Sequence, residues 1–191
     1  MKVLIIGASG LVGSNCFNAF KEKGWNCVGT YFSYETKQTV FYDTLNLENE
    51  NNFDVHKFNP NVIVHCGALT HVDYCEQNEA ESYEKTVVST QTMIELSKTL
   101  NAKLVFISTD YIFDGNDGPY EETATTNPIS IYGKHKLEAE HAVLNANQTN
   151  LVLRITNVYG DEERGKNFVA RMIDQIFEQQ KLNLRLPIDQ Y

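Results

Sequence analysis

The chain has 191 residues, of which 42 % are hydrophobic and 21 % are charged, and its formal net charge is −9. These values are typical of a soluble globular protein with enough chain for one well-packed domain. The negative charge, with no cluster of Lys and Arg, argues against nucleic acid and anionic membrane surfaces as partners.

The opening segment, MKVLIIGASG, has too short an apolar run for a signal peptide or a membrane-spanning helix. We therefore expect a cytoplasmic protein whose cysteines are free thiols, because they show no paired spacing. Four residues that could bind zinc do not have the spacing of a familiar site, and we predict no metal: His65, Cys66, His71 and Cys75.

Short apolar runs alternate with longer amphipathic ones along the chain. The apolar runs predict strands at residues 2–7, 26–32, 39–43, 61–67, 103–109 and 151–156. The amphipathic runs predict helices at residues 11–23, 48–57, 75–100, 131–146 and 166–180. Uninterrupted apolar strands separated by helices predict an α/β fold with a Rossmann-like, doubly wound parallel sheet and helices on both faces. Two segments exceed the usual loop length, residues 110–129 and those after 156.

Three glycines, Gly7, Gly10 and Gly13, follow the first predicted strand at the mouth of a predicted helix. Small residues there let the backbone approach a pyrophosphate, which accepts hydrogen bonds from the free N–H groups of the helix N-terminus. The strand–turn–helix context favours a dinucleotide site over a turn with no ligand. The residues expected to contact the cofactor are Gly7, Ser9, Gly10, Leu11, Val12 and Gly13.

The end of the second predicted strand bears on the choice of cofactor. No Asp or Glu stands at Tyr31, Phe32 or Ser33, where an acidic side chain would repel a 2′-phosphate. Ser33 and Lys37 could meet such a phosphate. In the alternative reading, Tyr31 and Phe32 cover the adenine and Lys37 is solvated. The sequence favours NADP and leaves NAD open.

The segment SIYGKHKLE places Tyr132 and Lys136 four residues apart on one face of a predicted helix that Ser130 caps. The same face continues through the apolar residues Ala139, Ala142, Val143 and Ala146. An ammonium group in a partly desolvated cleft would lower the pKa of a neighbouring phenol, and we expect Lys136 to do so for Tyr132. The alternative is a tyrosine at the edge of the core beside a lysine with a buried stem.

The fifth predicted strand ends at Ser108 and Thr109, facing the crevice where such sheets bind ligands. A hydroxyl group there can donate a hydrogen bond to a substrate carbonyl oxygen while Tyr132 supplies the proton. The following side chains either line the pocket or pack the long loop: Asp110, Tyr111, Phe113 and Asp114.

Taken together, the glycine turn and the segments STDYIFDG, NPISIYGKHKLEAE, VLRITNVYG and CGALTHVDYCE resemble the extended short-chain dehydrogenase/reductases, and most closely the dTDP-4-dehydrorhamnose reductase family. The resemblance covers essentially the whole chain, residues 1–191, as an NAD(P)-binding domain. It implies reduction of the 4-keto group of a nucleotide-linked 6-deoxyhexose by a reduced nicotinamide.

The resemblance also implies residue roles. Tyr132 would donate the proton, Lys136 would hold the nicotinamide ribose and Thr109 would bind the keto oxygen. Substrate would meet Thr109, Asp110, Tyr111 and Phe113. Further residues would flank the cofactor: Asn46, Cys66, Gly67, Ala68 and Thr70.

The chain departs from the family pattern at three places. Thr86 stands where the family usually has Asn, and Asn46 stands where it usually has Asp. Relatives continue beyond the stretch that corresponds to Asp189, Gln190 and Tyr191 into a C-terminal lobe, so we expect the substrate-binding lobe to be truncated after Tyr191.

Two alternatives stay open beside the reductase. The same motifs occur in the regulatory beta subunit of methionine adenosyltransferase, which binds NADP and a partner enzyme. A dehydratase or epimerase is less favoured, because Asp110 stands where a dehydratase would have an Asp-Glu pair. The expected partner is a nucleotide sugar, and a homodimer is left open.

Overall fold

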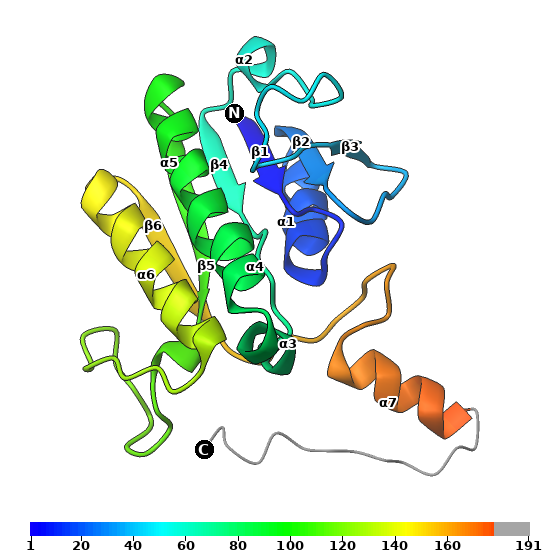
Figure 1. Ribbon diagram of the computed structural model, residues 1–191. Coiled ribbons are helices and arrows are strands. Elements are labelled where there is room, and N and C mark those ends of the chain that lie inside the picture. The colour runs from blue at the N-terminus through cyan, green and yellow to red at the C-terminus, as the bar shows by residue number, and fades with distance from the viewer. Residues whose placement is uncertain (178–191) are drawn as a thin grey trace.

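The structure, a computed structural model, describes residues 1–177 and contains one six-stranded parallel sheet (Figure 1). Its strand order is β3-β2-β1-β4-β5-β6. The strands are β1 (Lys2–Ile6), β2 (Asn26–Tyr31), β3 (Thr39–Phe41), β4 (Val62–His65), β5 (Lys103–Thr109) and β6 (Leu151–Ile155). All paired strands are parallel, which confirms the predicted doubly wound sheet.

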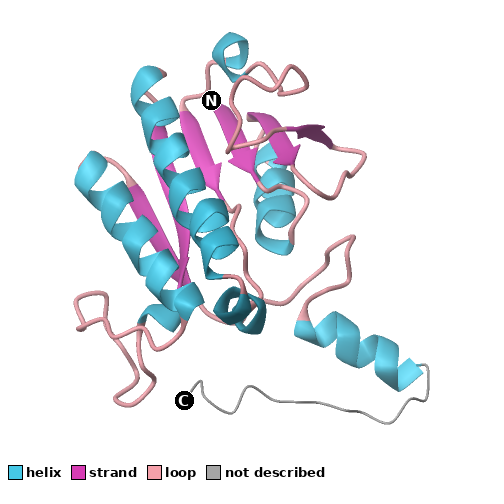
Figure 2. Cartoon of the chain, in the orientation of Figure 1, coloured by secondary structure: helices cyan, strands magenta, loops and turns pink. Residues whose placement is uncertain are grey.

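The central strands are buried on both faces, which explains their uninterrupted apolar runs. In β1, Leu4 and Ile5 point to opposite faces, and both side chains are fully buried. Helix α1 (Leu11–Glu22) covers one face, where Phe17 packs with Ile5 and Val64. Helices α5 (Ser89–Thr99) and α6 (Ile131–Ala146) cover the opposite face (Figures 1 and 2).

The helix predicted at residues 48–57 is mostly wrong. Only Val55–Phe58 forms a helix, α2, and the residues before it form turns. Asparagine side chains bond the backbone of this segment: the Asn52 side-chain amide donates to the Asn46 carbonyl oxygen at 2.9 Å, and the Asn49 side chain accepts from the Asn51 N–H at 3.0 Å. Such local bonds compete with helical ones.

The helix predicted at residues 75–100 is divided. It begins earlier, as α3 (Val72–Gln77), because the His71 side chain accepts a hydrogen bond from the Tyr74 N–H at 3.1 Å. Asn78 has a non-helical backbone, with φ −135° and ψ 56°, and separates α3 from α4 (Glu79–Tyr83). One π-helical turn, η1 (Glu84–Val88), then joins α4 to α5.

The two long connections follow β5 and β6. The first begins with a 3-10 turn, η2 (Asp110–Ile112), and continues to α6. The second leads to α7 (Phe168–Phe177), which Figure 1 draws apart from the sheet. The last residues of the helix predicted at 166–180 lie outside the described residues, as do Asp189, Gln190 and Tyr191. Within residues 1–177, no helix is long and apolar enough to cross a membrane.

Candidate active site

The glycine turn connects β1 to α1 and leaves the first amides of α1 open to an anion. Gly7 directly follows β1 with φ +81°, and a Cβ on Gly13 would lie 2.4 Å from the Gly7 carbonyl oxygen. Glycine is therefore needed at both positions. Gly10 is the N-cap and supplies no side-chain hydrogen bond, and the first turn of α1 contains no acidic residue. This arrangement fits the phosphates of a dinucleotide.

Three strand ends converge on this turn. The Ala8 N–H donates to the Thr30 carbonyl oxygen at 2.8 Å, which joins the turn to the end of β2. A Cβ on Gly7 would lie 3.0 Å from the Gly67 nitrogen, just after β4. The structure thus brings the segments containing Tyr31 and Gly67 to the glycine turn, as a shared cofactor site requires.

The remaining candidate cofactor residues occupy the loops around these strand ends. Ser9, Leu11 and Val12 belong to the turn and the first turn of α1, and Cys66 and Ala68 are half-buried after β4. Phe32, Ser33 and Thr70 are exposed. Asn46 is exposed in the asparagine-rich turn after β3, where its carbonyl oxygen accepts hydrogen bonds from that same turn.

Tyr132 lies in the first turn of α6 and is buried, as predicted from the sequence. Ser130 caps the helix, since its hydroxyl oxygen accepts a hydrogen bond from the Gly133 N–H at 3.0 Å. The Tyr132 ring meets the Tyr111 ring edge to face, with centroids 5.6 Å apart. The Thr109 hydroxyl group is a hydrogen-bond partner of the phenol. The structure therefore brings Thr109, Tyr111 and Tyr132 together.

The expectation that Lys136 lowers the pKa of Tyr132 is wrong for this structure. Burial raises the pKa of Tyr132 to about 12, which outweighs the lowering effect of the Thr109 hydrogen bond. The Lys136 amine instead donates a hydrogen bond to the Ile107 carbonyl oxygen at 2.5 Å and lies 4.1 Å from the centre of the Phe106 ring. Its charge is directed to β5 and away from the phenol.

The pKa of Lys136 is itself shifted far from its ordinary value. Burial lowers its pKa to about 7, although the Cys66 thiol and Glu140 act in the opposite direction. The neighbouring His65 is fully buried, and burial together with Lys136 lowers its pKa to about 3. Perturbed titratable groups of this kind cluster at functional sites.

Three buried side chains near the sheet have polar atoms without a hydrogen-bond partner among the described residues: His65, Thr86 and Ser108. Thr86 lies within the π-helical turn η1, so this turn forms with Thr at the position where the family usually has Asn. π-Helical turns of this kind are frequent at functional sites.

The sequence reasoning missed one ion pair next to the site. Glu140, one helical turn beyond Lys136, is 1 % exposed and pairs with Arg154 of β6. The i, i+4, i+8 spacing of Tyr132, Lys136 and Glu140 was the available signal, because it places a carboxylate on the buried face of α6.

The whole chain, residues 1–191, matches the family described as RmlD substrate binding domain. Among curated proteins it is 33 % identical over 187 residues to methionine adenosyltransferase 2 subunit beta of Xenopus laevis, covering 96 % of this chain and 55 % of that protein. It is 31 % identical over 175 residues to dTDP-4-dehydrorhamnose reductase of Aggregatibacter actinomycetemcomitans, covering 90 % and 56 %. The chain thus spans about half the length of these relatives.

The similar solved structures include two dTDP-4-dehydrorhamnose reductases and an epimerase that shares only the fold. A dTDP-4-dehydrorhamnose reductase from Clostridium acetobutylicum is 34 % identical with a TM-score of 0.77, covering 91 % of this chain and 59 % of that one. The enzyme from Bacillus anthracis, solved in complex with NADP, is 28 % identical with a TM-score of 0.78, covering 93 % and 60 %. A UDP-glucose 4-epimerase from Thermotoga maritima, 22 % identical with a TM-score of 0.83 over 95 % of this chain and 65 % of that one, shares the fold.

Proposed function

The chain belongs to the RmlD substrate binding domain family, and from this premise we propose that it is the cofactor-binding part of an NAD(P)H-dependent reductase. The substrate would be the 4-keto group of a nucleotide-linked 4-keto-6-deoxyhexose, as the similarity to dTDP-4-dehydrorhamnose reductase suggests. The observation that carries this proposal is the meeting of Thr109, Tyr111 and Tyr132 at the carboxyl edge of the sheet.

The open first turn of α1 would hold the pyrophosphate of the cofactor, with Gly7, Gly10 and Gly13 allowing its close approach. NADP is the preferred cofactor, supported by the NADP complex of the Bacillus anthracis relative and by the lack of an acidic residue at 31–33. NAD remains an alternative. When bound, the reduced nicotinamide would supply hydride to the keto carbon.

Residues of the chain would supply the proton that the keto oxygen takes up. Because its pKa is raised to about 12, Tyr132 is protonated at neutral pH and can act as a donor. Giving a proton to a developing alkoxide is downhill for a phenol, since an alkoxide is the stronger base. Thr109 would hold the keto oxygen beside Tyr132, and the Lys136 amine would hold the nicotinamide ribose.

The test is Tyr132→Phe in the full-length protein, assayed with NADPH and a dTDP-4-keto-6-deoxy sugar. We expect kcat/KM to fall by about 10²–10⁴ while the Kd for NADPH stays within about twofold. Tyr83→Phe is the matched control, because its hydroxyl group donates to Glu138 at 3.0 Å on an exposed part of α4. Unchanged turnover in Tyr132→Phe would contradict the assigned role.

A second candidate is a non-catalytic, NADP-binding regulatory subunit. It is favoured by the similarity to methionine adenosyltransferase 2 subunit beta, which also reaches 35 % identity over 178 residues in the protein from Bos taurus. Under this reading the full-length protein binds NADPH without reducing the sugar. It alters the activity of a partner enzyme, and Tyr132→Phe leaves that effect unchanged.

A further inference from the structure

Arg154 contacts both the catalytic helix and the long loop after β5. Its Nε donates to both carboxylate oxygens of Glu140, each at 3.2 Å, and its Nη2 also donates to that carboxylate. Its Nη1 donates to the Glu122 carbonyl oxygen at 2.8 Å, and its guanidinium carbon lies 5.5 Å from the centre of the Phe113 ring. One side chain on β6 therefore joins α6 to the segment 110–129.

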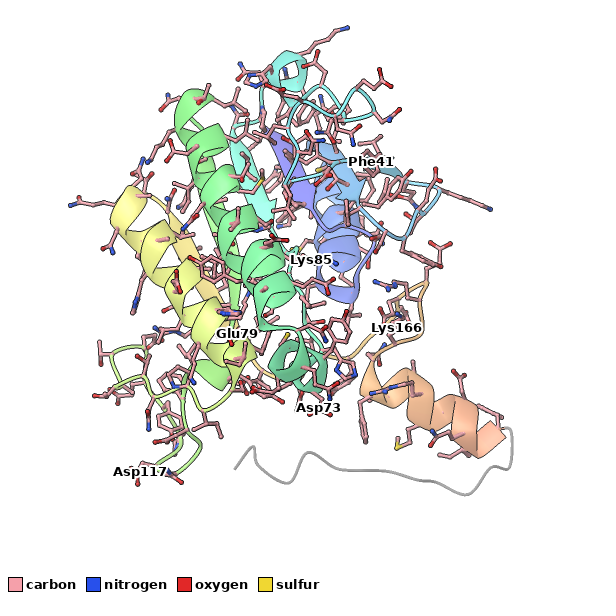
Figure 3. All side chains as sticks on the ribbon, viewed as in Figure 1. Phe41, Asp73, Glu79, Lys85, Asp117 and Lys166 are labelled. Carbon is pink, nitrogen blue, oxygen red and sulfur yellow. The ribbon has the colours of Figure 1, made fainter. Side chains whose placement is uncertain are left out.

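That segment is a folded unit. Phe113 and Tyr120 stack with ring centroids 4.3 Å apart and an interplanar angle of 2°. Asp114 accepts hydrogen bonds from the Asn116 N–H at 3.0 Å, from the Asn127 amide at 2.9 Å and from the Tyr120 hydroxyl at 2.8 Å, and these bonds hold its pKa well below the usual range. The tip of the segment is exposed, with Asp117 at the far end of the loop (Figure 3).

The base of the same loop enters the candidate active site. The Tyr111 N–H donates to the Thr109 hydroxyl oxygen at 3.2 Å, and the Tyr111 ring packs on Tyr132. Because the loop is internally bonded, a displacement of Phe113 away from Arg154 would carry Tyr111 with it. The contact of the loop with Arg154 on β6 therefore also fixes the position of Tyr111 beside the Tyr132 phenol.

We infer that Arg154 is a positioning residue that holds the segment 110–129 in place for substrate recognition while it neutralises the buried Glu140. The inference rests on the proposed reductase function. Arginine suits this double contact, since its planar fork presents several donors at once, whereas the single ammonium group of lysine cannot reach both the Glu140 carboxylate and the Glu122 carbonyl oxygen.

The test compares three variants of the full-length protein. Arg154→Gln combined with Glu140→Gln removes both charges together, which avoids leaving an unpaired buried carboxylate that could unfold the protein. Glu140→Gln alone keeps the arginine and its contacts with the loop. Arg154→Lys keeps the charge alone. Glu95→Gln combined with Lys98→Gln is the control, because this pair lies on the exposed surface of α5.

Hydrogen exchange of the amides in 111–127 and steady-state kinetics are the two readouts. In the double variant and in Arg154→Lys we expect loop exchange to accelerate at least about 10-fold and KM for the ketosugar to rise about 10-fold. In those variants the Kd for NADPH should stay within about twofold. Glu140→Gln and the surface control should resemble the unmodified protein in both readouts.

The inference is overturned if loop exchange in the double variant matches that of the unmodified protein. It is also overturned if Arg154→Lys has the same loop exchange and the same KM as the unmodified protein. Loop exchange requires no substrate, so the outcomes separate the two proposals. Faster exchange in a protein without sugar turnover would support the positioning role of Arg154 and contradict the reductase. Sugar turnover by the unmodified protein, together with unchanged loop exchange in the double variant, would support the reductase and contradict the positioning role of Arg154.

Discussion

Lys136 hydrogen-bonds the Ile107 carbonyl oxygen from inside the protein, with 2.5 Å between its amine nitrogen and that oxygen. This bond ties α6 to the end of β5, two residues before Thr109. It explains how the amine stays buried in a position where its pKa is lowered to about 7. It also explains why the amine does not lower the pKa of the phenol one helical turn away.

Replacing Lys136 by Met should change how stability depends on pH. An unfolded lysine binds its proton up to about pH 10.4, whereas the folded one releases it at about 7, so the unfolded state binds more protons between these values. The free energy of unfolding therefore rises with pH in this window, by about 1.4 kcal/mol per unit, for the unmodified protein only. Urea unfolding at about pH 7.5 and pH 9 should show a gain about 2 kcal/mol larger than in Lys136→Met. Equal gains would contradict the burial of the amine, and Lys98→Met, at an exposed position, is the control.

His65 should make the protein sensitive to acid. Its folded pKa of about 3 lies below the unfolded value, so lowering the pH from about 6.5 favours the unfolded state, which binds the extra proton. Between about pH 6.5 and pH 4.5 the unmodified protein should lose about 2 kcal/mol more stability than His65→Leu. The exposed His56, replaced by Leu, is the matched control for urea unfolding across this range. An identical pH dependence in His65→Leu and the unmodified protein would show that the imidazole is accessible to protons.

Gly133→Ala should destabilise the protein although alanine favours helices. A Cβ at this position would lie 2.2 Å from the Tyr111 carbonyl oxygen and 3.1 Å from the Pro128 side chain. Relieving this overlap must move the loop base or α6, at a cost of about 2 kcal/mol. Asn145→Ala, at an exposed position of the same helix, should be neutral or slightly stabilising. Thermal and urea unfolding of both variants measure the difference, and a stable Gly133→Ala would refute the close contact.

Ser130→Ala should remove the N-cap of α6. The lost hydrogen bond to the Gly133 N–H should reduce the free energy of unfolding by about 1 kcal/mol. Ser130→Thr keeps a hydroxyl group and should retain most of that stability. If the alanine and threonine variants unfold at the same urea concentration, the cap contributes nothing measurable.

The sequence by itself determined the parallel sheet, the glycine turn and the position of Tyr132 in a capped first helical turn. These features depend on local patterns: apolar runs, glycines at a strand end, and a serine before a helix. The same local reasoning failed at residues 48–57, where asparagine side chains bond the backbone more readily than a helix forms.

Only the tertiary structure decided the electrostatics of the site. Whether Lys136 acts on Tyr132 depends on which acceptor its amine meets, and β5, distant in sequence, supplies the Ile107 carbonyl oxygen. The ion pair between Glu140 and Arg154 likewise joins α6 to β6, the strand that follows it in the chain. Spacing along one helix fixes which residues share a face, but burial and partners from other elements set their pKa values, and these arise only when the chain is packed.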